Sequence, residues 1–101
     1  MKGNRKTMSD LATLQAKIYG RVQGVFFRAF IQEQGTKLGL TGYVRNLATE
    51  EAVEVWAEGD RAKLETLIGY LKLGPPRASV SEVITDWSQY TGDYSGFSIR
   101  Y

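Results

Sequence analysis

The spacing of apolar residues changes several times along this 101-residue chain, and each change predicts a new element. The first pattern has a period of two and predicts a half-buried strand, with apolar positions at Leu14, Ala16, Ile18 and Val22. The spacing then becomes helical and breaks near Gly39, with one stripe formed by Phe27, Phe30, Ile31, Gln34 and Leu38. The pattern therefore opens with a strand that is followed by a helix.

Two strands and a second helix are expected next. Residues 42–47 (GYVRNL) predict a strand, residues 47–51 (LATEE) a short loop, and residues 53–58 a further alternating strand. Asp60 can then cap a helix with an apolar stripe of Leu64, Leu67, Ile68 and Leu71. Gly74, followed by two prolines, marks the end of this helix.

The remaining pattern completes a known order of elements. Residues 78–87 predict a strand whose alternation slips between Val80 and Val83, which indicates a bulge, and Phe97, Ile99 and Tyr101 predict a short last strand. The order is that of an α+β, ferredoxin-like split βαβ sandwich with one extra strand. We expect one antiparallel sheet of four to five strands with two helices on one face. This scaffold is widely reused, so it does not by itself give the function.

The composition excludes several kinds of chemistry. The chain contains no cysteine and no histidine, so it has no disulfide, thiol nucleophile or thiolate metal site, and it lacks the commonest general base. The carboxylates show no metal-ligand spacing, and no metal site is expected. There is no run of eighteen apolar residues, and residues 1–13 lack the apolar stretch of a signal peptide. We therefore expect a cytoplasmic protein that does not enter a membrane.

The net charge of +2 is concentrated at the start of the chain. Residues 1–13 carry three basic residues and one acidic residue, whereas residues 14–101 carry ten of each sign and are neutral. We expect residues 1–13 to form a flexible basic tail. It either binds phosphate groups or is simply solvated, and we favour the solvated tail. Residues 14–101 are expected to form one domain. Its neutrality argues against broad nucleic-acid binding.

The stretch GRVQGVFFR (residues 20–28) places a positive charge where a helix normally avoids one. Arg28 falls in the first helical turn, and no Ser, Thr, Asp or Asn precedes it in this stretch to cap the first amides. Gly20 and Gly24 permit a tight loop whose N–H groups can surround an anion. A bound phosphate would cap the helix and pair with Arg28. The alternative is an ordinary turn, but the missing cap and the arginine together favour anion binding.

Two further candidates have weaker signals. Asn46 ends the segment GYVRN, although asparagine is depleted in strands, and it either positions a water or begins the following turn. Tyr19 and Trp56 fall on the polar phase of the first and third strands, where their rings could stack on RNA bases. Glu54 and Glu58 flank Trp56 and would repel a phosphate backbone. Packing of the two rings against loops or the tail is therefore favoured.

The segment GRVQGVFFR followed by GYVRN closely resembles the two signature segments of the acylphosphatase family. The similarity continues through VEVWAEG, the GPP after the second predicted helix and the aromatic FSIRY, and it covers about residues 14–101. The resemblance implies a ferredoxin-like fold that hydrolyses acyl phosphates to a carboxylate and inorganic phosphate. It also implies that the reaction uses no metal, cofactor or covalent intermediate.

The resemblance also implies roles for individual residues. It assigns phosphate binding to the Arg28 side chain and to the main-chain amides of Gln23, Gly24, Val25, Phe26, Phe27 and Arg28. It assigns orientation of the attacking water to Asn46. Members of the family often carry a Pro-Asp-Gly turn after this asparagine, whereas this chain has LATEE. The geometry of the hairpin beside Asn46 is therefore left open.

The expected protein is a small, monomeric, cytoplasmic acylphosphatase that acts on a small-molecule acyl phosphate and binds neither nucleic acid nor membrane. One alternative is a non-catalytic phosphate- or carbamoyl-phosphate-binding module, like the acylphosphatase-type domain of a larger hydrogenase-maturation protein. A less favoured alternative is an RNA-binding module that uses Tyr19 and Trp56. The acyl group stays open between carbamoyl phosphate, acetyl phosphate and bisphosphoglycerate.

Overall fold

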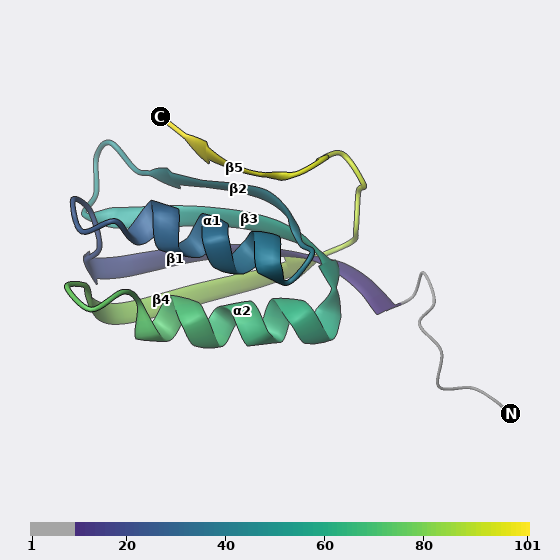
Figure 1. Ribbon diagram of the computed structural model, residues 1–101, viewed down its shortest axis with the longest axis horizontal. Helices are drawn as coiled ribbons and strands as arrows, with labels where there is room; N and C mark the ends of the chain where they lie inside the picture. The colour runs from purple at the N-terminus through teal and green to yellow at the C-terminus, as the bar shows by residue number, and fades with distance from the viewer. Residues whose placement is uncertain (1–9) are drawn as a thin grey trace, which may run out of the picture.

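The computed structural model describes residues 10–101, so most of the predicted basic tail lies outside the described residues. Five strands and two helices follow one another in the predicted order (Figure 1). Their bounds are β1 Leu11–Arg21, α1 Phe27–Lys37, β2 Thr41–Asn46, β3 Ala52–Asp60, α2 Arg61–Leu73, β4 Ser79–Ser88 and β5 Phe97–Arg100. β1 begins three residues before the predicted domain boundary, and Leu11 pairs with Asp60 of β3. Residues 11–13 thus belong to the sheet and not to the tail.

The strands form one sheet in the order β4-β1-β3-β2-β5, with both helices on the same face (Figure 1). β1 runs antiparallel to β3 and β4, and β2 runs antiparallel to β3, as predicted. The expectation of an antiparallel sheet does not extend to β5, which pairs parallel with β2. β5 follows β4 in the chain but lies at the opposite edge of the sheet, and residues 89–96 form the crossover segment that carries the chain from one edge to the other.

Local signals in the sequence explain where two features of this fold occur. Asp60 caps α2 as predicted, because its Oδ1 accepts a hydrogen bond from the Ala62 N–H at 2.9 Å. The predicted bulge lies in β4, where Tyr19 pairs with Glu82 but Gly20 pairs with Val80. Gly20 has a φ of 128°, and a Cβ there would lie only 2.1 Å from the carbonyl oxygen of Ser79.

The core lies between the sheet and the helices. Every second residue of the central strands points into it, and the helices add one stripe each. Its fully buried larger members are Leu14, Ile18, Val22, Phe27, Ile31, Val44, Val53, Val55, Leu64, Leu67 and Leu71. The register brings the end of β1, the β2–β3 hairpin and the end of β5 to one end of the sheet, where α1 begins (Figure 1).

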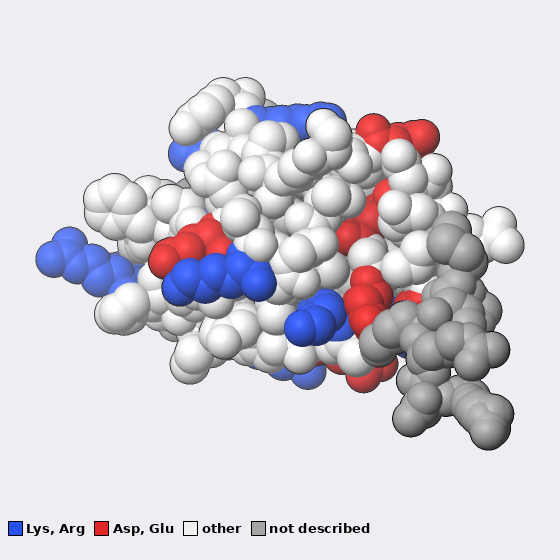
Figure 2. All heavy atoms as spheres, turned by 45° about the vertical axis from the view of Figure 1, so that its right-hand side comes forward, with Lys and Arg blue, Asp and Glu red and all other residues white. Residues whose placement is uncertain are grey.

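The surface of the described residues has two features that bear on partners. Neither helix is long and apolar enough to cross a membrane, a finding that covers residues 10–101. On the side of the molecule shown in Figure 2, basic and acidic side chains are interspersed and do not gather into broad areas of one sign.

Candidate active site

The loop between β1 and α1 leaves the start of the helix without a cap. Phe26 occupies the N-cap position with φ 61° and ψ 23°, and it makes no side-chain capping hydrogen bond. No acidic residue stands in the first turn of α1. The structure thus confirms the missing cap that the sequence predicted, and it places Arg28 in this first turn.

The main-chain donors of this loop have no acceptor in the described part of the chain. The Phe30 N–H donates to the Phe26 carbonyl at 3.0 Å, which is the first hydrogen bond of the helix. Within residues 10–101, no acceptor forms a hydrogen bond with the main-chain N–H groups of residues 23–29. These donors lie at the positive end of the α1 dipole, where an anion is stabilised.

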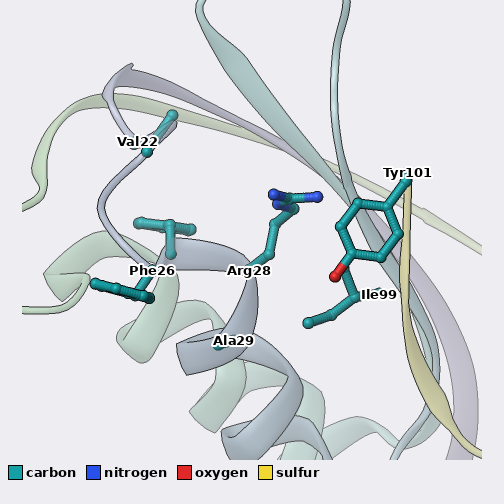
Figure 3. A pocket seen from close by; sticks show the side chains of 8 residues that line it. Val22, Phe26, Arg28, Ala29, Ile99 and Tyr101 are labelled. Atoms are coloured by element: carbon teal, nitrogen blue, oxygen red, sulfur yellow. The ribbon is translucent and has the colours of Figure 1, made fainter.

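Arg28 lies beside these donors and is held by an aromatic ring. Its guanidinium carbon lies 4.8 Å from the centre of the Tyr101 ring, a cation–π contact (Figure 3). In the described part of the chain no carboxylate forms an ion pair with Arg28. The positive charge is therefore not neutralised by the protein at this site.

A cleft of about 280 Å³ opens next to Arg28. Val22 and Phe26 lie on one side of the guanidinium, and Ile99 and Tyr101 lie on the other (Figure 3). The remaining lining residues are Gly24, Phe27 and Ala29. The cleft is smaller than the ~300–1,000 Å³ pockets that hold drug-sized ligands, so it suits a small ligand.

Asn46 reaches this end of the sheet from the last position of β2. Val44 is buried in the core, and Asn46, two residues later, projects from the same helix-covered face. Its Oδ1 is buried and has no hydrogen-bond partner among residues 10–101. A buried acceptor without a donor is uncommon and calls for an explanation.

The Gln23 side chain connects the loop to the hairpin that carries Asn46, a contact that sequence reasoning missed. Its Nε2 lies 3.1 Å from the carbonyl oxygen of Leu47, 3.1 Å from that of Glu50 and 2.8 Å from that of Ala52. The hairpin itself is closed by the Leu47 N–H, which donates to Ala52 at 3.0 Å. The LATEE segment thus forms a turn that its own Leu47–Ala52 hydrogen bond closes, and the Gln23 side chain adds hydrogen bonds to the carbonyl groups of this turn.

Phe26 is placed unusually for a large apolar residue. It is the one residue other than glycine with a positive φ in residues 10–101, and it is 82% exposed. The left-handed conformation costs a non-glycine residue roughly 1–2 kcal/mol. Such outliers gather at ligand sites, where the surrounding structure maintains them.

The two aromatic residues considered for RNA binding do not form a common platform. Trp56 pairs with Gln15 of β1, whereas Tyr19 pairs with Ala52, four positions further along the sheet. This separation is roughly 13 Å at the usual rise of a strand. A hydrogen bond with the Glu50 carboxylate, together with burial, raises the pKa of Tyr19. Tyr19 is thus engaged with an acidic side chain.

Ile99 and Tyr101 form the second wall of the cleft, and sequence reasoning missed them. The aromatic segment FSIRY is part of the family resemblance, but the resemblance assigns no role to either residue. Alternation along β5 places both on the helix-covered face, beside the start of α1.

No group of three or more Asp or Glu side chains suited to a metal ion occurs in residues 10–101.

Comparisons with known proteins agree with this geometry. Residues 14–99 match the family model described as acylphosphatase. An acylphosphatase of Dehalococcoides mccartyi is 49% identical over 88 residues, which are 87% of this chain and 97% of that protein. The structure of an acylphosphatase from Coxiella burnetii is similar with a TM-score of 0.86 and 36% identity, covering 94% of this chain and 98% of that chain.

A similar fold also occurs within a much longer chain. The crystal structure of full-length HypF in the phosphate- and nucleotide-bound form matches with a TM-score of 0.80 and 28% identity. That match covers 90% of this chain but only 12% of HypF.

Proposed function

This chain belongs to the acylphosphatase family, as its sequence resemblance predicted, and on that premise we propose that it hydrolyses the carboxyl–phosphate bond of small acyl phosphates. The products are a carboxylate and inorganic phosphate. The observation that carries the proposal is the uncapped start of α1, where main-chain N–H groups without an acceptor among residues 10–101 lie beside the Arg28 guanidinium, which forms no ion pair with those residues.

The phosphoryl group would bind to this loop. The N–H groups of residues 23–28 can donate to its oxygens, and the planar guanidinium of Arg28 can donate two further hydrogen bonds. Phosphoryl transfer depends mainly on positioning and on stabilising the charge of the transition state. By analogy with oxyanion holes, each well-placed donor contributes roughly 2.7–4 kcal/mol to that stabilisation.

Asn46 would orient the attacking water. A carboxamide does not titrate, so Asn46 is not a general base, but its buried Oδ1 can accept a hydrogen bond from the water. The water oxygen attacks phosphorus in line while the acyl oxygen leaves with the bonding electron pair. The leaving group is a stable carboxylate and needs no general acid. The water proton passes to a phosphoryl oxygen of the substrate.

The role of Arg28 is tested by Arg28→Gln. We expect the variant to lose competitive inhibition by inorganic phosphate and turnover of benzoyl phosphate, which absorbance follows directly, because the charged fork is gone. Arg61→Gln is the matched control, since Arg61 also stacks on an aromatic ring, Trp87, at 3.9 Å but belongs to α2. Full activity of Arg28→Gln would refute the assigned role.

The role of Asn46 is tested by Asn46→Ala in the same assay. We expect kcat to fall by about 100-fold or more, because the water is no longer positioned. The inhibition constant of phosphate should stay within about threefold, since the loop donors and Arg28 are unchanged. An unchanged kcat would show that Asn46 does not act on the water.

We propose a cytoplasmic monomer that binds no nucleic acid and whose basic tail precedes β1. The neutrality of residues 14–101 and the interspersed charges in Figure 2 support the exclusion of nucleic acid.

A non-catalytic phosphate-binding module on this fold would bind phosphate without turning over benzoyl phosphate, so the benzoyl phosphate assay separates the two functions.

A further inference from the structure

The cleft beside Arg28 combines one positive charge with apolar walls. Of its lining residues only Arg28 is charged. Val22 and Phe26 form the wall on the loop side, and Ile99 and Tyr101 form the wall on the side of β5 (Figure 3). A ligand that fills this cleft thus meets one cationic side chain and polar main-chain groups of the loop, and the side chains of both walls give it apolar contacts.

Phe26 is the member of this cleft whose presence most needs a reason. Its backbone conformation suits glycine, and its side chain is 82% exposed. The packed core therefore gains little from this ring. A large apolar side chain that is kept exposed on a strained backbone at a cleft is expected to contact a ligand.

The direction of the acyl group follows from in-line attack. The acyl oxygen must lie opposite the water, which in the proposed mechanism is held by the buried Oδ1 of Asn46. The acyl group then lies on the side of the phosphoryl group that faces away from this water. Phe26 and Tyr101, both highly exposed, line the cleft beside Arg28 and can contact an acyl group there.

We propose that the walls formed by Phe26, Ile99 and Tyr101 bind the acyl group, and that the enzyme selects acyl phosphates with a neutral, apolar acyl group, best an aromatic one. This inference rests on the proposed acylphosphatase activity and adds its substrate class. An aromatic acyl group gains contact with the apolar walls and a favourable ring contact with Phe26 or Tyr101. A second carboxylate or phosphate on the acyl group finds no second cation among the lining residues.

The experiment compares kcat/KM for benzoyl phosphate and acetyl phosphate. The ratio of the two values isolates the acyl group, because both substrates place the same phosphoryl group on the loop. Phe26→Gly fits the observed φ of 61° and removes the ring, and Ile99→Ala shortens the opposite wall without touching the loop. We expect the benzoyl-to-acetyl ratio to fall about tenfold in Phe26→Gly and about threefold in Ile99→Ala, relative to the unmodified protein. Intrinsic reactivity of the substrates cancels in this comparison.

Ile84→Ala is the matched control, because Ile84 is half exposed but pairs with Lys17 on the sheet face away from the helices. Its ratio should equal that of the unmodified protein. If the unmodified protein turns over both substrates and neither cleft variant changes the ratio, or Ile84→Ala changes it equally, the acyl-binding walls are refuted and the proposed activity stands. If the unmodified protein turns over neither substrate, the proposed activity itself fails.

Discussion

Phe26 shows at the scale of one residue how a site can shape the backbone. Phe26 has a φ of 61°, and at this residue the loop turns directly into α1. The main-chain N–H groups around it, in residues 23–29, have no acceptor among residues 10–101. A glycine adopts this conformation without steric conflict, whereas a side chain meets the following carbonyl group. The residue that stands here is nevertheless a phenylalanine, and its ring borders the cleft.

Substitutions at Phe26 should therefore separate backbone strain from packing. Phe26→Val places a β-branched residue at a positive φ, and we expect it to lower the free energy of unfolding by about 1–2 kcal/mol. Phe26→Gly should stay within about 1 kcal/mol of the unmodified protein, because relief of strain offsets the greater entropy of the unfolded chain. Urea unfolding measures both. Equal stability of the two variants would contradict the positive φ.

Gln23 shows how two elements are joined at the site. Its side chain reaches three carbonyl oxygens on both sides of the β2–β3 turn, at 2.8–3.1 Å. The turn follows Asn46 directly, so one amide group links the loop that we propose to hold phosphate with the strand that we propose to hold the water. A Pro-Asp-Gly turn is not required for this closure, since the turn of this chain is held by Gln23 and by its own Leu47–Ala52 hydrogen bond.

Removal of this link should impair turnover more than binding. For Gln23→Leu we expect kcat for benzoyl phosphate to fall about tenfold, because Asn46 is less well held, while phosphate inhibition changes by less than about threefold. Gln15→Leu is the control, since the Gln15 amide donates at 3.2 Å to Glu54 on the face away from the helices. A Gln23→Leu enzyme with unchanged kcat would show that the link has no role in catalysis.

The sequence predicted the elements that depend on local signals. Asp60 before α2, the missing cap before α1 and the slipped alternation of β4 each act within a few residues, and each prediction is confirmed. Contacts between distant segments could not be read in this way. The parallel pairing of β5 with β2 depends on where the crossover places a four-residue strand, and no local pattern encodes it.

The same difference between local signals and contacts of distant segments applies to the site and to the start of β1. Arg28 and Asn46 stood out because their residue types conflict with their local positions, whereas the Gln23 side chain and the Ile99 wall act across the fold. The alternation that begins at Leu14 predicted the first strand, and residues 1–13 were assigned to the tail. Thr13 is nevertheless buried, and its hydroxyl oxygen lies 2.5 Å from a carboxylate oxygen of Glu58 and 2.9 Å from the Gln89 carbonyl oxygen.

At the scale of the whole molecule, Glu58 fastens the crossover to the sheet at the end opposite the site. Its carboxylate is fully buried and accepts hydrogen bonds from the Thr13 hydroxyl, the Thr91 N–H and hydroxyl, and the Gly92 N–H. Burial acts to raise the pKa of Glu58, but these hydrogen bonds outweigh it and lower the pKa below its usual range. The carboxylate thus stabilises the fold in its charged form.

This lowered pKa predicts how stability depends on pH. A carboxyl with a depressed pKa in the folded state contributes stability above its unfolded pKa of about 4.3, and loses it as the pH falls through the folded pKa. We expect Glu58→Gln to lower the free energy of unfolding by about 2 kcal/mol at pH 7 and by less at acidic pH. Urea unfolding across this range measures the difference.

Glu65→Gln is the control for this effect. Glu65 is exposed on α2 and pairs with Arg61 at 3.5 Å, so its loss should change the free energy of unfolding by less than about 1 kcal/mol at any pH. Kinetic constants for benzoyl phosphate should be unchanged in Glu58→Gln, because Glu58 lies at the far end of the sheet. A stability difference for Glu58→Gln that does not shrink at low pH would contradict the charged, hydrogen-bonded carboxylate.

The central proposal is that the uncapped start of α1 and Arg28 hold the phosphoryl group. Titration of the 15N-labelled protein with inorganic phosphate tests it most directly. We expect the largest chemical-shift changes at the amides of residues 23–28 and at the Arg28 Nε–H, saturating at the concentration that inhibits turnover. Changes centred on another surface, with the amides of residues 23–28 unmoved at saturation, would contradict the proposed site.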